Sequence, residues 1–470
     1  MTVSLVRDPR SAASVSYDLL VVGGGFYGTM VTLEAARRGL SVLLLERDDF
    51  GGATSWNSLR IVHGGLRYLQ SLDLARYRES VAERRWFLET FPDLVEPLPC
   101  LMPLYDPPRG GRLRRQAVFH LALALSRTEG RVVDAAEAVR IFPEVDQAGL
   151  LGGALWYDAV MPDSQRVLIE ALRWAHRCGA RSLNYTEAVE LRMREGRVTG
   201  LRAVDRETGE SLELRGRAIV NCAGPWSRQL AGRFDRDLPE LFRPLLAFNL
   251  LLDREPPATM ALAVAGRGRE AQTWFLVPWK GRVLAGTAYV AGARTPPDRE
   301  DVEEFIAALN EAVPGWKLRA SEVLRVFHGW LPAEADGSAV PASLPVIHDH
   351  GTGLVSVSGV KLTTARAVAE RTLSLLFNDL PAPGWIDRPE PDPPLPLDDF
   401  LDLAARDREA ARVHMQGLVE RQAVVHLEDL LLRRADWGIH PEGGVAARLC
   451  TALGWGSGRT GLRAAGGAGR

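Results

Sequence analysis

Three glycines between two apolar runs carry the clearest chemical signal in this chain. Residues 18–22 have the composition of a buried strand, Gly23, Gly25 and Gly28 follow, and a second apolar run ends in Glu46. In such a strand–turn–helix unit the first glycine allows a tight turn, the second lets backbone approach a pyrophosphate, and the third lets the helix pack on the strand. The unpaired N–H groups at the helix start attract the anion. Glu46 lies 18 residues after Gly28, where a carboxylate can accept hydrogen bonds from ribose hydroxyls.

These features together predict an adenine dinucleotide. The alternative, a glycine-rich turn without a ligand, is less consistent with a pattern in which both strands, the helix and the acid are in place. Arg47 follows Glu46, but the carboxylate would repel a ribose 2′-phosphate, so FAD or NAD fits better than NADP.

Length and composition indicate an ordinary globular protein. The 470 residues suffice for about two to three domains, and 46% of them are hydrophobic and 25% charged. A net charge of −2 gives no general reason to expect nucleic acid as a partner. The four cysteines lack CxxC spacing and a nearby histidine cluster, so neither a metal site nor a disulfide framework is predicted.

Targeting and linker patterns are sparse. Residues 1–16 lack the apolar run of a signal peptide, and no stretch reaches the roughly 18 apolar residues of a membrane span, so we expect a cytoplasmic protein. Residues 113–126 have the pattern of an amphipathic helix with a basic start, which fits either a packed helix or peripheral contact with the inner face of an anionic membrane. The proline-rich residues 381–397 predict a linker, residues 398–455 a helical domain, and residues 456–470 a disordered tail.

Several later segments resemble the signature of FAD-dependent glycerol-3-phosphate dehydrogenases, in the D-amino-acid-oxidase-like superfamily. The segments are TSWNSLRIVHGGLRYL (54–69), NCAGPW (221–226), FLVPW with a later GT (275–279 and 286–287) and GVKLTT (359–364). The resemblance implies an α/β fold and non-covalently bound FAD. The implied fold has three parts: a GR2-type, Rossmann-like FAD-binding domain built from discontinuous segments, a substrate domain with an antiparallel sheet, and a short C-terminal helical region.

The resemblance also suggests where the domains begin and end. The FAD-binding domain is expected at residues 17–95, 155–240 and 340–380, and the substrate or cap domain at residues 96–154 and 241–339.

Within the first matched segments, the cofactor-binding residues implied by the resemblance are mainly small or hydroxylated. Thr54 and Ser55 supply hydroxyls and backbone donors near the pyrophosphate or flavin. The His63-Gly64-Gly65 run would let the chain press against the isoalloxazine, where side chains must be absent. Ala223 and Gly224 permit a similar close approach beside the dinucleotide.

The last matched segment is expected to face the flavin pyrimidine. Gly359 precedes a helix starting near Leu362 and Thr363, whose N–H dipoles would be aimed where reduction develops negative charge. Lys361, in a chain with only three lysines, fits as a cationic partner of reduced flavin or substrate. The alternative for Lys361 is a solvated lysine at a helix start.

The chain departs from the family pattern in the substrate pocket. Where the family carries V-R-P-L, with an Arg that grips the substrate phosphate, this sequence has Leu331, and His348 stands at the place of a second family Arg. The K-G-S-H segment is replaced by residues 246–249, while Arg67 and Tyr68 are kept. Arg offers planar bidentate donors and Leu offers none, so the loss of two such contacts predicts phosphate binding weaker by several kcal/mol, at roughly 1.5–3 kcal/mol for each charged hydrogen bond.

The resemblance implies oxidation of a carbon that bears a hydroxyl, with hydride passing to flavin N5 and a base removing the hydroxyl proton. His328 is our first hypothesis for the base and His63 the second, although either could be a structural histidine. The residues expected to act in catalysis are His328, Lys361, Arg67 and His63. Those expected to contact the substrate are Arg67, Tyr68, Arg243 and His348.

Two other functions remain open at this point. One is an amine or amino-acid oxidase, in which Arg67 or Arg243 would hold a substrate carboxylate. The other is a non-catalytic flavin-binding homologue whose pocket has decayed. The electron acceptor implied by the family is a quinone at a membrane surface or, for oxidases, oxygen, and the sequence leaves the oligomeric state undetermined.

Overall fold

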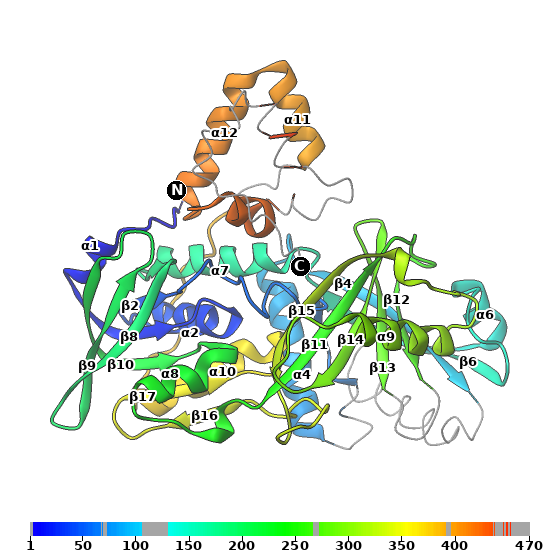
Figure 1. Cartoon of the computed structure of the whole chain (residues 1–470), viewed down its shortest axis with the longest axis horizontal. Coiled ribbons are helices and arrows are strands. Elements are labelled where there is room, and N and C mark those ends of the chain that lie inside the picture. The colour runs from blue at the N-terminus through cyan, green and yellow to red at the C-terminus, as the bar shows by residue number, and fades with distance from the viewer. Residues whose placement is uncertain are drawn as a thin grey trace.

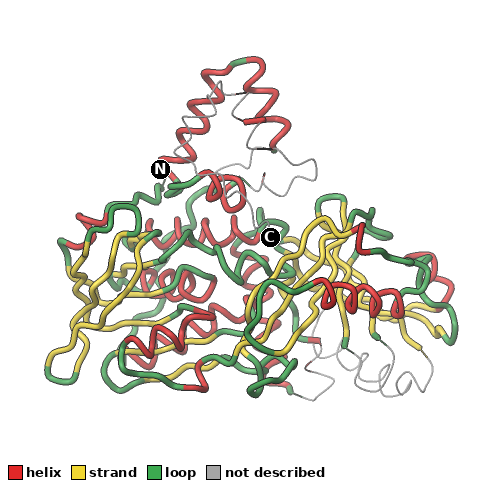
Figure 2. Tube along the Cα trace, in the orientation of Figure 1, coloured by secondary structure: helices red, strands yellow, loops and turns green. Residues whose placement is uncertain are grey.

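The computed structural model contains two β-sheets with helices packed on them and a C-terminal helical part (Figures 1 and 2). The structure describes residues 3–66, 68, 73–105, 130–266, 272–391, 396–435, 437, 445, 448, 449 and 452. The predicted helix over residues 113–126 and the predicted tail over residues 456–470 lie outside the described residues.

The first sheet has the strand order β16-β17-β10-β1-β2-β7, with β8 and β9 continuing from β10. Its strands are β1 (Ser16–Val22), β2 (Val42–Leu45), β7 (Arg181–Leu183), β8 (Thr186–Arg194), β9 (Arg197–Asp205), β10 (Ser211–Asn221), β16 (Val346–Asp349) and β17 (Leu354–Ser358). The central pairs β1–β2, β1–β10, β2–β7 and β10–β17 are all parallel. A parallel strand is covered on both faces, which explains why residues 19–21 form a continuous apolar run without exposed surface.

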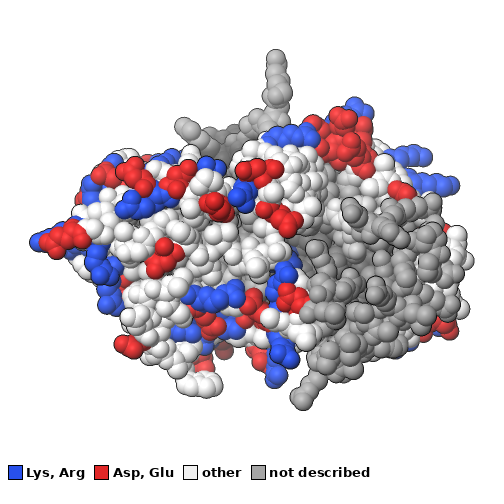
Figure 3. Space-filling view, turned by 90° about the horizontal axis from the view of Figure 1, so that it is seen from below, with Lys and Arg blue, Asp and Glu red and all other residues white. Residues whose placement is uncertain are grey.

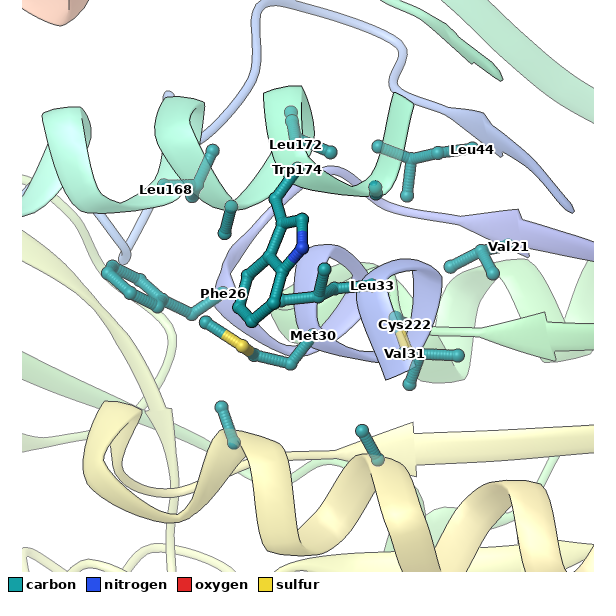
Figure 4. Close-up of a cluster of buried hydrophobic side chains, with 14 of the residues drawn as sticks. Val21, Phe26, Met30, Val31, Leu33, Leu44, Leu168, Leu172, Trp174 and Cys222 are labelled. Carbon is teal, nitrogen blue, oxygen red and sulfur yellow. The ribbon is translucent and has the colours of Figure 1, made fainter. Parts of the chain in front are cut away.

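Three helices, α2 (Phe26–Arg37), α7 (Ser164–Arg177) and α10 (Ala365–Leu376), contribute to the core on one face of this sheet. Figure 4 shows side chains of α2 and α7 meeting there, among them Phe26, Met30, Leu33, Leu168, Leu172 and Trp174. The opposite face is covered by β8, β9 and two short helices, α1 (Pro9–Ala13) and α8 (Ser227–Arg233). Because α2 is buried on nearly all sides, its start is held firmly at the carboxyl end of β1.

The second sheet has the order β15-β11-β14-β13-β12-β4-β6-β3, with β5 paired to β6. Its strands are β3 (Ile61–Val62), β4 (Glu96–Tyr105), β5 (Arg131–Asp134), β6 (Leu150–Val160), β11 (Pro244–Leu252), β12 (Ala261–Ala265), β13 (Thr273–Trp279), β14 (Arg282–Ala291) and β15 (Val323–Pro332). Among the described residues, its strand pairs are antiparallel except β4–β12. Helices α6 (Ala135–Ile141) and α9 (Arg299–Ala312) pack on its core, and α4 (Leu74–Thr90) contacts β6 while its Phe87 belongs to the core of the first sheet. The predicted combination of a discontinuous parallel sheet with an antiparallel second sheet is confirmed.

Strand pairing differs from the predicted domain boundaries at two places. Residues 61–62 and 155–160 were assigned to the FAD-binding domain, but β3 and the end of β6 pair with each other in the second sheet. The reason is that residues 61–62 leave the loop that follows β2 as a short edge strand, and two residues are too few to show a hydrophobic period. The other boundaries stay a prediction.

The C-terminal part contains α11 (Leu397–Arg406), α12 (Arg408–Arg421) and a π-helical turn over Asp429–Arg434, with α11 and α12 projecting from the body in Figure 1. Described residues of the predicted linker have no regular structure but are attached to the body. Gly384 N–H donates to the Arg37 carbonyl at 2.7 Å, and Trp174 Nε1 donates to the Ile386 carbonyl at 2.7 Å. The linker is therefore anchored to α2 and α7.

No helix among the described residues is both long and apolar enough to cross a bilayer. On the face shown in Figure 3, acidic and basic side chains are interspersed over the described atoms.

A histidine near the end of α7 predicts a pH dependence of stability. His176 Nε2 lies 2.9 Å from the Ser182 hydroxyl, and burial lowers the pKa of His176 to about 4. An unfolded chain binds this proton near pH 6.5, so the free energy of unfolding should fall as the pH drops from about 6.5 to about 4, by up to about 3 kcal/mol. Denaturant titrations of the wild type and His176→Gln across this range test the effect. The glutamine does not titrate, so its stability should change less with pH; equal slopes would contradict the prediction.

Candidate active site

A cavity of about 940 Å³ is lined by residues of both sheets and of the C-terminal part. This volume is within the range of about 300–1,000 Å³ usual for small-molecule and cofactor sites. The lining from the first sheet and its loops includes Val22, Gly23, Gly25, Glu46, Thr54, Ser55, Cys222, Ala223, Gly224, Trp226, Val357, Gly359, Lys361, Leu362 and Thr363. The second sheet adds Ile61, Ala247, Asn249, Thr287, Tyr289, Gly329, Trp330 and Leu331, and the C-terminal part adds His426, Glu428 and Arg433.

The glycine turn after β1 is built as a cradle that only glycine permits. Gly23 has φ +110°, and a Cβ there would lie 2.3 Å from the Cys222 carbonyl oxygen. A Cβ on Gly28 would lie 1.8 Å from the Gly23 carbonyl oxygen, so this glycine sets the packing of helix on turn. Gly25 precedes α2 without any side-chain cap, and the Phe26 N–H donates to Ser55 Oγ at 3.1 Å. The first-turn N–H groups of α2 therefore form an anion site bordered by a hydroxyl.

Glu46 is fixed at the end of β2 beside this turn. Its Oε2 accepts from Gly24 N–H at 2.7 Å and its Oε1 from Asp48 N–H at 2.9 Å. Burial raises the pKa of Glu46, while these two hydrogen bonds act in the opposite direction. Each carboxylate oxygen keeps a second lone pair at the cavity wall, where it can accept from a sugar hydroxyl.

The segment around Gly359 is seated on α2 by a tyrosine that the sequence analysis did not identify. Tyr27 Oη accepts from the N–H groups of Val360 and Lys361, both at 3.1 Å, and donates to the Lys361 carbonyl at 2.7 Å. A Cβ on Gly359 would lie 2.0 Å from the Tyr27 ring, so the turn requires glycine. Burial raises the pKa of Tyr27, which keeps its hydroxyl a donor.

Lys361 stands at the start of the helical turn Leu362–Thr364, which continues into α10. Its Nζ donates to Tyr68 Oη at 2.5 Å and lies 4.7 Å from the centre of that ring. The structure thus brings together Lys361 and Tyr68, both expected at the site.

His63 is held at the cavity wall by an aspartate. His63 Nδ1 lies 3.2 Å from Asp158 Oδ2, and the other carboxylate oxygen accepts from Gly64 N–H at 2.7 Å. Although burial alone would raise the pKa of Asp158, the hydrogen bonds with His63 and Gly64 bring it below its ordinary value. An ionised Asp158 favours the tautomer with the proton on Nδ1, which leaves Nε2 as an acceptor. Asp158 was not identified from the sequence because it lies 95 residues from His63 and belongs to no motif.

Gly64 and Gly65 pack closely against α4. A Cβ on Gly64 would lie 2.7 Å from Arg84 Nη1, and a Cβ on Gly65, which has φ +80°, would lie 2.7 Å from Ser80 Cβ. Neither glycine is among the residues that line the cavity. The glycines permit close packing against α4, and their expected contact with the flavin stays a prediction.

Three further candidates are not brought to the cavity. His328 Nδ1 lies 2.9 Å from Thr295 Oγ1, Arg243 pairs with Asp336 at 3.4 Å, and the His348 ring packs against His350. None of the three lines the cavity, so the hypothesis that His328 is the base has no support from its position. Arg67 lies outside the described residues.

The wall that β11, β14 and β15 contribute holds polar and apolar side chains, and none of its described residues is charged. Asn249 Nδ2 donates to the Asn57 carbonyl at 2.9 Å, and its Oδ1 accepts from Thr287 Oγ1 at 2.9 Å. Leu331 lines the cavity on the neighbouring strand β15. Thr54 Oγ1 donates to the Trp330 carbonyl at 3.0 Å, which joins this wall to the loop that follows β2.

The site combines a glycine turn, the start of α2, the Glu46 carboxylate and a second helix start at Leu362. This combination fits an adenine dinucleotide that carries a second ring system. The profile of the family described as FAD dependent oxidoreductase matches residues 18–375. The chain therefore belongs to the family of FAD-dependent oxidoreductases.

Among its relatives, the chain is 28% identical over 400 residues to the glycerol-3-phosphate dehydrogenase of Synechocystis sp., which covers 80% of this chain and 72% of the relative. It is 31% identical over 395 residues to the mitochondrial glycerol-3-phosphate dehydrogenase SDP6 of Arabidopsis thaliana, covering 77% of this chain and 60% of that one. A crystal structure of the glycerol-3-phosphate dehydrogenase from Bacillus halodurans complexed with FAD has the same fold, with a TM-score of 0.70 and 22% identity over 96% of this chain and 93% of that one.

Proposed function

We propose that this protein oxidises a hydroxyl-bearing carbon of a phosphorylated polyol or a related hydroxy compound. The observation that carries the proposal is the His63–Asp158 pair, which presents an imidazole to the cavity of an FAD-dependent family member. When bound, FAD supplies the acceptor for the hydride that leaves the carbon. The likeness to glycerol-3-phosphate dehydrogenases supports this class of donor.

The residues proposed to hold FAD are those of the two helix starts and the strand end. The α2 start with Gly23, Gly25 and Ser55 receives the pyrophosphate, and Glu46 receives the ribose hydroxyls. The flavin side is bounded by Thr54, Ala223, Gly224, Gly359, Leu362 and Thr363, all of which line the cavity.

The proton is proposed to move to His63. Nε2 accepts the proton of the substrate hydroxyl as the carbon loses hydride, so the oxygen becomes a carbonyl oxygen. Asp158 positions the ring and stabilises the imidazolium through Nδ1–H. Lys361, with its ammonium held by Tyr68, supplies positive charge where reduction makes the site more negative.

The alternatives are less well supported by the geometry. Of the two arginines expected to hold a substrate carboxylate in an amino-acid oxidase, Arg243 pairs with Asp336 and does not line the cavity, and Arg67 lies outside the described residues. A non-catalytic homologue has no need of a buried carboxylate that orients a cavity histidine, whereas this chain has such a carboxylate in Asp158, which contacts His63.

Anaerobic reduction of the bound flavin tests the proposal. The purified protein is mixed with glycerol 3-phosphate, other polyol phosphates, 2-hydroxy acids and amino acids, and loss of the oxidised flavin absorbance is followed. Bleaching by a hydroxylated donor supports the proposal, and bleaching by amino acids alone contradicts it. Reoxidation by a quinone or by oxygen then identifies the class of acceptor.

Leu331 offers a separate test of the substrate pocket. Leu331→Arg restores a guanidinium at the position where the family carries its phosphate-gripping Arg. A charged hydrogen bond contributes about 1.5–3 kcal/mol, so KM for glycerol 3-phosphate should fall by about 10- to 100-fold. Leu331→Gln, which adds polarity without charge, is the matched control. An Arg variant with an unchanged KM would show that this residue does not face the phosphate.

A further inference from the structure

A segment beyond the family-matched region forms part of the cavity. Residues 422–434, named here the C-terminal clamp, follow α12 and come after the match that ends at residue 375. Three clamp residues, His426, Glu428 and Arg433, line the same cavity as the glycine turn. The family motifs therefore do not account for one wall of this cavity.

The clamp is joined to the dinucleotide-binding region by a buried ion cluster. Asp49 accepts from Arg433 Nε at 2.6 Å and from Arg434 Nη1 and Nη2 at 2.8 and 2.7 Å. Arg433 Nη2 also donates to Asp429 Oδ1 at 2.8 Å. The four side chains of this cluster, two arginines and two aspartates, are each no more than 8% exposed, and they carry two positive and two negative charges. Despite burial, the two guanidinium groups hold the pKa of Asp49 below its ordinary value.

Further contacts fix the backbone of the clamp. Asp429 Oδ2 accepts from the N–H groups of Val425 and His426 at 2.9 and 2.8 Å, and its Oδ1 accepts from Tyr185 Oη at 2.6 Å. Asn184 Nδ2 donates to both the Ala423 carbonyl and Asp49 Oδ1. The clamp is therefore bound to the loop that follows β7 as well as to the loop that follows β2.

These contacts place the clamp near Glu46, at the end of the cavity proposed to hold the nucleotide. Asp49 comes three residues after Glu46, the carboxylate suited to ribose, and Tyr185 also lines the cavity. The His426 ring packs edge-on against Tyr185, with centroids 4.7 Å apart, and His426 Nε2 lies 3.0 Å from Glu207 Oε1. Within the described part of the chain, neither His63 nor Lys361, at the end proposed to react, has a hydrogen bond or ion pair with the clamp.

We propose that the C-terminal clamp forms a wall of the site for the ADP part of FAD, so that docking of the clamp and binding of the ADP part strengthen each other. The proposal rests on the FAD site described under Proposed function and extends it to residues outside the family match. Coupling between two binding events is reciprocal: a ligand that binds better when the clamp is docked must also favour docking. FMN, which lacks the adenylate, should not have this effect.

Hydrogen exchange of the full-length apoprotein tests the coupling directly. ADP and FAD should each slow amide exchange within residues 422–434, including the Val425 and His426 amides, while FMN leaves these amides unchanged. Exchange that is unaffected by ADP would overturn the proposal, as would equal protection by FMN. The result does not depend on any donor reducing the flavin, so it separates this proposal from the proposed reaction.

Release of FAD from the holoprotein gives a second readout. His426→Ala removes a cavity-lining side chain that is 32% exposed and should speed FAD release about three- to tenfold, by loss of a contact of about 1 kcal/mol. His414→Ala is the matched control, since His414 lies on α12 and does not line the cavity; its release rate should match the wild type. Equal release rates for the two variants would count against the clamp as a wall of the nucleotide site.

Discussion

His63→Ala is expected to lower the rate of flavin reduction by the preferred donor about 10²- to 10⁴-fold, the usual range for loss of a general base. The side chain is 38% exposed at the cavity wall, and its Nδ1 is engaged by Asp158, so Nε2 is the nitrogen available for the substrate proton. FAD content should be unchanged, because the residues proposed to hold the dinucleotide are elsewhere. Stopped-flow absorbance under anaerobic conditions measures the rate, and the flavin-to-protein ratio checks the cofactor.

Two companion variants make this result specific. Asp158→Asn removes the charge that stabilises the imidazolium and should also slow reduction, without moving His63 far, because the amide can still hydrogen-bond. His328→Ala is the matched control: His328 is a second histidine of the chain, but it bonds to Thr295 and does not line the cavity. Normal reduction by His63→Ala would rule out His63 as the base, and a large loss in His328→Ala alone would assign that role to His328.

The sequence predicts the relative positions of site residues best where these residues are close together along the chain. The cradle of Gly23, Gly25 and Gly28 and the carboxylate of Glu46 belong to one strand–turn–helix–strand unit, whose geometry follows from local sterics and hydrogen bonding. The structure brings Glu46 to the glycine turn through a hydrogen bond to Gly24. In such a unit the spacing along the chain largely fixes the distance in space.

Residues that depend on strand register or on distant pairing could not be placed in the same way. His328 lies between Phe327 and Gly329 on β15, where successive side chains point to opposite faces of the sheet. A register shift of one residue therefore moves a side chain to the other face. Family alignment in a divergent stretch does not resolve a single-residue shift. The partners Asp158 and Tyr27 come from elements joined only by tertiary packing, so no spacing in the sequence identifies them.

The glycines at positions 64 and 65 show a different limit. A glycine in a motif indicates that something approaches the backbone closely, but the sequence does not say what approaches. Here the neighbours are Arg84 and Ser80 of α4. The same ambiguity applies to the C-terminal part, where helical patterns predicted a separate domain but gave no indication that Arg433 would enter the cavity.

Asp49→Ala is expected to lower the free energy of unfolding of the holoprotein by about 3–5 kcal/mol, the cost of leaving buried charges without their partner. The variant removes the carboxylate that accepts three hydrogen bonds from Arg433 and Arg434. These two side chains are only 7% and 2% exposed. Denaturant unfolding with excess FAD measures the loss.

Asp48→Ala is the neighbouring control for this stability prediction. Asp48 is 53% exposed and pairs with Arg47 and Arg206 at the surface, so its loss should cost less than about 1 kcal/mol. Adding Arg434→Met to Asp49→Ala removes one of the stranded charges, and the double variant should recover part of the lost stability rather than lose more. Additive losses would mean that the two side chains act independently, in which case the C-terminal clamp is held by its backbone contacts and not by the buried ion cluster.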